Sequence, residues 1–162
     1  GYGIGEAATT LVGQSIGASR RKLAKQFATI TVTMGGIIMG IMGLLLYMFA
    51  PLMMGILTPV PEIIAQGAAA LRIEAFAEPF FAIAIVSYGV FVGAGDTLIP
   101  CGINLASMWG VRITLSATLA PTMGLQGVWT AMCIELIFRG VMYLIRLRSG
   151  RWIKIKEAQP AT

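Results

Sequence analysis

Residues 26–61 read QFATITVTMGGIIMGIMGLLLYMFAPLMMGILTPVP and contain no charged side chain, and residues 113–134 form a second uncharged run. A helix needs about 20 apolar residues to cross about 30 Å of hydrocarbon, so each run is long enough to span a bilayer. The 162 residues are 57% apolar and 12% charged, with no histidine, and their mean hydropathy is +0.82. This composition predicts an all-α membrane protein and excludes soluble α/β enzymes, disulfide-rich scaffolds and disordered tails.

The apolar runs and the turn residues between them predict five transmembrane helices, with no β-hairpin signal. Their expected ranges are about 3–17, 23–49, 62–93, 98–120 and 125–147. Residues 1–147 thus form a helical lobe, and residues 148–162 a basic cytoplasmic tail. Gly1 already lies in an apolar segment and lacks the basic start of a secretory signal, which indicates a fragment of a larger protein.

Prolines and glycines mark the expected connections between these helices. Segment 51–61 holds three prolines and no charge, which predicts a loop whose last proline, Pro61, opens the next helix. Residues 93–97, Gly-Ala-Gly-Asp-Thr, predict a tight turn with Asp or Thr as a cap. Residues 121–124 predict another turn, which begins at a proline and ends at a glycine.

Basic side chains gather in two blocks, at residues 20–25 and after residue 145, whereas the connections at 51–61 and 121–124 carry none. The positive-inside bias predicts that such blocks lie in the cytoplasm, next to anionic headgroups. Four predicted helices separate the two blocks, so both blocks are expected on the same side of the membrane. We therefore expect a multi-pass protein of the plasma (inner) membrane with cytoplasmic basic loops and C-terminus. Basic blocks that directly flank apolar runs also argue against nucleic acid as a partner.

Small residues in the apolar runs are expected to serve packing. Glycines four apart let membrane helices approach closely. The pairs with this spacing are Gly13 and Gly17, Gly36 and Gly40, and Gly89 and Gly93. Cys101 and Cys133 lack Cys-x-x-Cys spacing and have no histidine to complete a site, so they are predicted to be small core residues, with no metal cluster.

Ionisable residues inside apolar spans are the candidates for function, because each costs about 2.5–3.5 kcal/mol at a helix centre unless it is paired or faces water. They are Glu6, Arg72, Glu74, Glu78, Arg112, Glu135 and Arg139. Glu135 and Arg139 lie four apart, which predicts a structural intrahelical ion pair. Glu6 shares a stripe of polar and small residues with Thr10, Gly13 and Gly17, which is either an ion-coupling site or a polar seam against another helix.

Glu74 and Glu78 also lie four apart, but their charges have the same sign and cannot neutralise each other. Such a pair can share a proton near neutral pH or help to ligate Na+. Pro79 removes one helical hydrogen bond and predicts a kink, so a structural hinge would adjoin the acids. The alternative is that this long helix extends past the bilayer and lifts Glu74 into outer water.

The sequence contains no recognisable catalytic motif, and we expect that the protein is not an enzyme. Without histidine there is no zincin motif and no serine–histidine arrangement, and neither a Gly-x-Ser-x-Gly elbow nor a phosphate-binding loop is present. Asp96 is the only aspartate and lies in a predicted turn, which argues against an intramembrane aspartyl pair.

Several motifs together resemble the second half of the multidrug and toxic compound extrusion (MATE) family. In chain order they are GEAATTLVGQSIGA at 5–18 followed by a basic stretch, Leu-Arg-Ile at 71–73, Gly-Ala-Gly-Asp-Thr at 93–97 with Pro100, Gly-Val-Trp at 127–129, and Gly-Arg-Trp at 150–152. The resemblance covers nearly the whole chain and keeps the order and spacing of the motifs.

The resemblance implies a fold of twelve helices in two six-helix lobes around a cavity that opens alternately to either side. The five predicted helices would then be helices eight to twelve, and the amino-terminal lobe and the seventh helix would be the missing partners. Family members export cationic or amphipathic compounds in exchange for H+ or Na+, with no other cofactor, and often use acidic residues of the second lobe, including one on the tenth helix. Glu74 and Glu78 lie on that helix.

The resulting hypothesis is secondary-active multidrug or cation efflux by H+ or Na+ antiport, with Glu6, Glu74 and Glu78 as candidate ion-coupling residues. One alternative is a lipid-linked oligosaccharide flippase of the same superfamily, which would need a strongly cationic cavity. The other is a non-transporting membrane scaffold, for which the three acids would be dispensable.

Overall fold

The computed structural model describes residues 1–153, and this part of the chain is helical apart from short turns. Its elements are α1 (Tyr2–Gly17), α2 (Arg21–Leu57), α3 (Pro61–Gly93), α4 (Leu98–Ala106), the π-helical segment η1 (Ser107–Ile113), α5 (Thr114–Met123) and α6 (Leu125–Ser149). No strand occurs in this described range, so the predicted all-α fold is confirmed. Lys154 and Lys156 of the expected basic tail lie outside the described residues.

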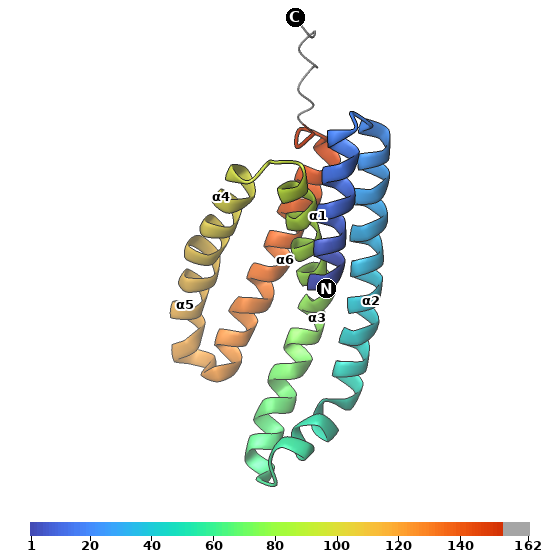
Figure 1. Cartoon of the computed structure of the whole chain (residues 1–162). Coiled ribbons are helices and arrows are strands. Elements are labelled where there is room, and N and C mark those ends of the chain that lie inside the picture. The colour runs from blue at the N-terminus through green and yellow to red at the C-terminus, as the bar shows by residue number, and fades with distance from the viewer. Residues whose placement is uncertain (154–162) are drawn as a thin grey trace, which may run out of the picture.

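Helix α3 lies at the centre of the bundle and packs against α1, α2 and α6 (Figure 1). The buried positions of its second half, from Ala82 to Phe91, are almost all apolar, as suits a helix surrounded by others. The rod formed by α4, η1 and α5 packs on α6. Small alanine and valine side chains fill the core between α1, α2 and α3, and Phe91, Tyr143 and Trp152 close it with edge-to-face ring contacts.

Four stretches of the described chain are long and apolar enough to cross a membrane: Arg21–Leu57, Pro61–Gly93, Leu98–Met123 and Leu125–Ser149. The fifth predicted span, α1, has 16 residues, which at 1.5 Å per residue is about 24 Å and shorter than the hydrocarbon core. Large apolar side chains such as Ile37, Leu44 and Met48 of α2 are exposed. A surface of this kind belongs in a lipid bilayer.

The prediction of a loop at residues 51–61 is wrong for most of that segment. Helix α2 continues through Pro51 to Leu57, and only residues 58–60 separate it from α3, which begins at Pro61 as predicted. Backbone polar groups in an apolar setting must be paired, so a helix tolerates one missing bond at a proline better than it tolerates unwinding. Figure 1 shows α2 changing direction in its last turns, as a proline kink produces.

The fourth predicted helix, expected at about 98–120, is longer and less regular than predicted. It runs from Leu98 to Met123 with Pro121 inside α5, so the expected turn at 121–124 is reduced to Gly124, whose φ is +58°. Its middle, η1, is π-helical. The hydropathy pattern does not indicate a π-helical turn, because that pattern reports which residues are apolar and not how the backbone hydrogen bonds are spaced.

The predicted role of small residues in packing holds between α1 and α3. A Cβ added to Gly89 would overlap the carbonyl oxygen of Gly5, and one added to Gly93 would overlap that of Thr9. Thr9 Oγ1 also donates a hydrogen bond to the carbonyl oxygen of Gly89 over 2.9 Å. The two backbones are therefore in direct contact, which fixes the position of α1 on α3.

The α1–α2 connection, the α3–α4 turn and the C-terminal end of α6 lie at one end of the bundle (Figure 1). Lys25 Nζ approaches Gly150 there, so the two basic blocks are neighbours in space. Asp96 of the turn accepts a hydrogen bond from Arg146 Nε over 2.9 Å, and both side chains are largely buried. One cysteine prediction is wrong, because Cys101 on the outward face of α4 is exposed, whereas Cys133 is buried.

Candidate functional site

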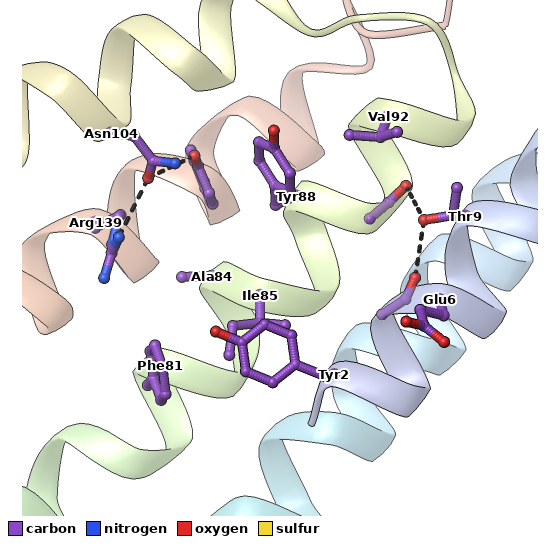
Figure 2. A pocket seen from close by; sticks show the side chains of 13 residues that line it. Tyr2, Glu6, Thr9, Phe81, Ala84, Ile85, Tyr88, Val92, Asn104 and Arg139 are labelled. Carbon is purple, nitrogen blue, oxygen red and sulfur yellow. Dashed lines mark hydrogen bonds between the residues drawn. The ribbon is translucent and has the colours of Figure 1, made fainter.

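A partly open cleft of about 490 Å³ lies between α1, α3, α4 and α6 (Figure 2). Helix α3 forms its floor, and α1 and α6 stand on either side. The residues that line it are Tyr2, Gly5, Glu6, Thr9, Phe81, Ala84, Ile85, Tyr88, Gly89, Val92, Asn104, Arg139 and Tyr143. The lining thus combines aromatic rings with one carboxylate and one guanidinium group.

Glu6 is the predicted coupling residue that the structure places in this cleft. Its side chain is exposed on α1, near Tyr2 in Figure 2. The Thr9 to Gly89 hydrogen bond and the glycine contacts hold this part of α1 against α3, so Glu6 is presented from a fixed backbone. The polar stripe noted in the sequence is therefore divided, with Gly13 packing on α3 and Glu6 facing the cleft.

Polar contacts between α4 and α6 hold the opposite wall of the cleft, and the sequence analysis did not predict them. Tyr143 Oη lies 2.9 Å from the carbonyl oxygen of Pro100 and 3.0 Å from Asn104 Oδ1. Arg139 Nη1 donates to the same Asn104 oxygen over 3.3 Å. These contacts join α6 to α4 and leave Asn104 and Arg139 at the edge of the cleft (Figure 2). The feature of the sequence that could have indicated these contacts is Asn104, a polar residue inside an apolar run.

Glu135 and Arg139 are in contact, with Arg139 Nε 3.3 Å from Glu135 Oε1, but the pair is part of a larger cluster. Arg112 Nη2 lies 2.6 Å from Glu135 Oε2, and Ser107 Oγ donates to Oε1 over 2.5 Å. Glu135 is fully buried, so it needs several donors. Reasoning from helix spacing missed these two partners, because they reach Glu135 from another element.

The π-helical geometry of η1 explains how Ser107 and Arg112 reach one carboxylate. In an α-helix, side chains five residues apart point about 140° away from each other. The wider π turn, with bonds between residues five apart, brings such positions onto one face. Both residues of η1 therefore point at Glu135.

Glu74 and Glu78 lie away from the cleft lining, in the interfaces of α3 with its neighbours. A Cβ added to Gly43 would lie 3.1 Å from Glu78 Cβ, so Glu78 packs against α2. Glu74 Oε2 and Glu78 Oε2 are buried without a hydrogen-bond partner among the described residues. The two acids therefore lie outside the cleft that Glu6 faces.

Comparison with known proteins gives one consistent result. The chain is 29% identical to a probable multidrug resistance protein NorM of Thermotoga maritima over 160 residues, which are 94% of this chain and 33% of that protein. It is 26% identical to multidrug and toxin extrusion protein 2 of Mus musculus over 158 residues, 96% of this chain and 28% of that protein. It is 24% identical to the uncharacterized transporter YisQ of Bacillus subtilis over 156 residues, which are 95% of this chain and 34% of that protein.

The chain spans about a third of the length of these curated relatives. Residues 1–118 match the MatE family model, which takes in α1, α2, α3, the cleft residues they carry and the acids of α3. With its helical fold and its membrane-spanning helices, the chain belongs to the MatE family.

Proposed function

We propose that this chain forms part of a secondary-active exporter that moves cationic or amphipathic small molecules across the plasma membrane in exchange for H+ or Na+. The observation that carries the proposal is the cleft, in which an exposed carboxylate, Glu6, stands among aromatic side chains, including Tyr2 and Tyr88. Aromatic faces attract organic cations, and a carboxylate adds a direct charge interaction. A volume of about 490 Å³ lies in the range of about 300–1,000 Å³ typical of small-molecule sites.

The charge balance of the cleft favours a cation over an anionic lipid. Arg139 is the cationic side chain of the lining, and Glu135 and Asn104 already engage it. The Glu6 carboxylate makes no ion pair with another described residue, so the net charge offered to a ligand is negative. A flippase for lipid-linked oligosaccharides, the first alternative, would need the opposite balance.

The driving cation is assigned to Glu74 and Glu78 in this proposal. Each has a buried carboxylate oxygen without a described partner, and such atoms are costly unless a proton, a cation or a donor meets them. Pro79 follows directly inside α3 and weakens the helix next to the acids, which suits a hinge. Na+ bound there would use carboxylate oxygens, its preferred kind of ligand.

The orientation follows from the basic blocks, which occupy one end of the bundle and are assigned to the cytoplasm. With both blocks inside, the loop at residues 58–60 faces outward. The role of a transporter also agrees with the absence of catalytic motifs from the sequence, and we propose no enzymatic activity.

The substrate role of Glu6 is tested by the Glu6→Gln variant in the full-length protein that carries this sequence. We expect efflux of an organic cation such as ethidium to fall at least severalfold, because the amide keeps the volume but removes the charge. Glu62→Gln is the matched control, since Glu62 is an exposed acid in the first turn of α3, outside the cleft lining. Equal efflux by both variants at matched membrane expression would favour the scaffold alternative for this part of the chain.

A further inference from the structure

The exposed basic side chains at the end of the bundle where α2 begins form one patch, although they come from two distant segments. The members of this basic patch are Arg20, Arg21, Lys22, Lys25, Arg148 and Arg151. Lys25 joins the two segments, because a Cβ added to Gly150 would lie 3.3 Å from Lys25 Nζ. Residues 18–25 and 148–153 contain no acidic residue, and the aspartate of the α3–α4 turn is buried in an ion pair. The two segments therefore contribute only positive charge to this surface.

An apolar groove of about 390 Å³ begins one helical turn after the basic patch. Its lining comes from α2 alone and consists of Thr29, Ile30, Thr33, Met34, Ile37 and Ile38. Ile30 and Ile37 are each 59% exposed. The hydroxyl of Thr29 donates to the carbonyl oxygen of Lys25 over 2.9 Å, so it is engaged within the helix. The groove thus presents an exposed apolar surface, which is typical of a site that contacts a membrane or a partner.

The basic patch and the groove follow each other along one face of α2. Residues three or four apart are neighbours on a helix surface. Lys22 is therefore next to Lys25, and Lys25 is next to Thr29, where the groove begins. From Thr29 to Ile38 the groove extends over about 14 Å at 1.5 Å per residue, which is close to one leaflet of a hydrocarbon core of about 30 Å.

We propose that the basic patch and the groove of α2 together bind one anionic phospholipid, with its phosphate at Lys22 and Lys25 and an acyl chain in the groove. Lysine binds phosphate as a point charge, and basic clusters beside membrane helices attract anionic headgroups. Basic side chains in the first turn also oppose the dipole of α2, and a bound phosphate offsets that repulsion. The site requires that α2 lies in a bilayer, but it depends on neither the substrate nor the driving ion of the proposed exporter.

An anionic phospholipid matches both parts of this surface, whereas the competing occupants match one part each. A free phosphate would use the lysines and leave the exposed isoleucines of the groove uncovered. An apolar helix from the rest of the full-length protein would cover the groove and leave the basic patch without counter-charge. Such a helix would also keep lipid away from α2, so the two occupants of the groove give opposite results with a lipid probe.

The test places a bimane fluorophore between the patch and the groove, by Gln26→Cys in the full-length protein that carries this sequence, with all its other cysteines replaced. The protein is reconstituted in phosphatidylcholine vesicles at about 0.15 M NaCl, where diffuse electrostatic attraction decays over about 8 Å. Traces of nitroxide-labelled phosphatidylglycerol should quench the fluorophore severalfold more than labelled phosphatidylcholine. In the matched control the fluorophore is on Cys101, which is exposed near the start of α4 on the other side of the bundle (Figure 1), and the two lipids should quench equally.

Three variants at exposed positions assign the selectivity at Gln26 to the two parts of the site. Lys22→Gln combined with Lys25→Gln should bring the quenching ratio of the two lipids close to one. Arg72→Gln removes an exposed cation from α3 and should leave the ratio unchanged. Thr33→Phe fills the groove without a change in charge and should lower the ratio. An unchanged ratio in Thr33→Phe would overturn the role of the groove, and equal quenching by both lipids at Gln26 would overturn the site.

A second measurement separates the phospholipid from a free phosphate. Phosphatidylglycerol added to the parent protein in detergent should raise its melting temperature, because a ligand that binds only the folded state stabilises it. Inorganic phosphate at the same concentration should give no such rise, and the Lys22→Gln, Lys25→Gln variant should lose most of the rise with the lipid. An equal rise with inorganic phosphate would contradict a phospholipid site.

Discussion

Thr9 of α1 donates a hydrogen bond from Oγ1 to the carbonyl oxygen of Gly89 in α3 over 2.9 Å, at the point where the two backbones come into direct contact. The contact is possible because position 89 has no side chain. It places Tyr2 and Glu6, one to two turns earlier on α1, at the rim of the cleft. The geometry of the cleft therefore depends on a position that carries no functional group.

Substitution of Gly89 by alanine should separate α1 from α3. The added Cβ would overlap the carbonyl oxygen of Gly5, and overpacking of this kind costs about 1–3 kcal/mol. Gly102→Ala is the matched control, because a Cβ at that helical position meets no atom within 4 Å. We expect a lower melting temperature in detergent for Gly89→Ala only. Equal melting temperatures for the two variants would show that the close contact is absent.

The Asp96–Arg146 pair should stabilise the basic end of the bundle. Asp96 is 2% and Arg146 12% exposed, and loss of one partner from a buried pair costs about 3–5 kcal/mol because the other charge remains buried. Asp96→Asn should thus lower the melting temperature strongly, whereas Arg148→Gln, at an exposed position on the same helix, should change it little. The prediction fails if the two variants are equally stable in thermal unfolding.

The two ends of the bundle should face opposite sides of the membrane. Single cysteines at Ala18 and Pro59, in a background without Cys101 and Cys133, should react with a membrane-impermeant maleimide from opposite sides. Ala18 is preferred to Ser19, whose φ of 57° is strained for a side-chain-bearing residue. The positive-inside bias predicts that Ala18 is on the cytoplasmic side. Labelling of both positions from one side would contradict the topology.

Much of the fold could be predicted because it depends on local sequence. Uncharged runs set the helices, and Pro61 marks the start of α3. Pro51 and Pro121 misled the prediction, because a helix in apolar surroundings keeps its remaining hydrogen bonds despite a proline. The four-residue spacing of Gly89 and Gly93 indicated packing, but only the structure shows that α1 is the partner.

Less of the candidate site than of the fold could be predicted from the sequence, because the site depends on which helices pack against each other. Glu6 was singled out by its charge, and it lies in the cleft. Glu135 and Arg139 were paired from their spacing, yet Ser107 and Arg112 reach Glu135 only because η1 is π-helical. A π turn leaves no mark in the pattern of apolar residues, so this part of the cluster could not be inferred from the sequence.

The central claim, cation-coupled export through this lobe, is tested most directly by the double variant Glu74→Gln, Glu78→Gln in the full-length protein that carries this sequence. The measurement is drug accumulation in cells against external pH and Na+, at matched membrane expression, with Glu62→Gln as the exposed-acid control. The account predicts that the double variant loses most of its efflux and its dependence on the driving ion, because the amides keep the volume but cannot hold a shared proton or Na+ as the carboxylates do. Full efflux with unchanged ion dependence would contradict it.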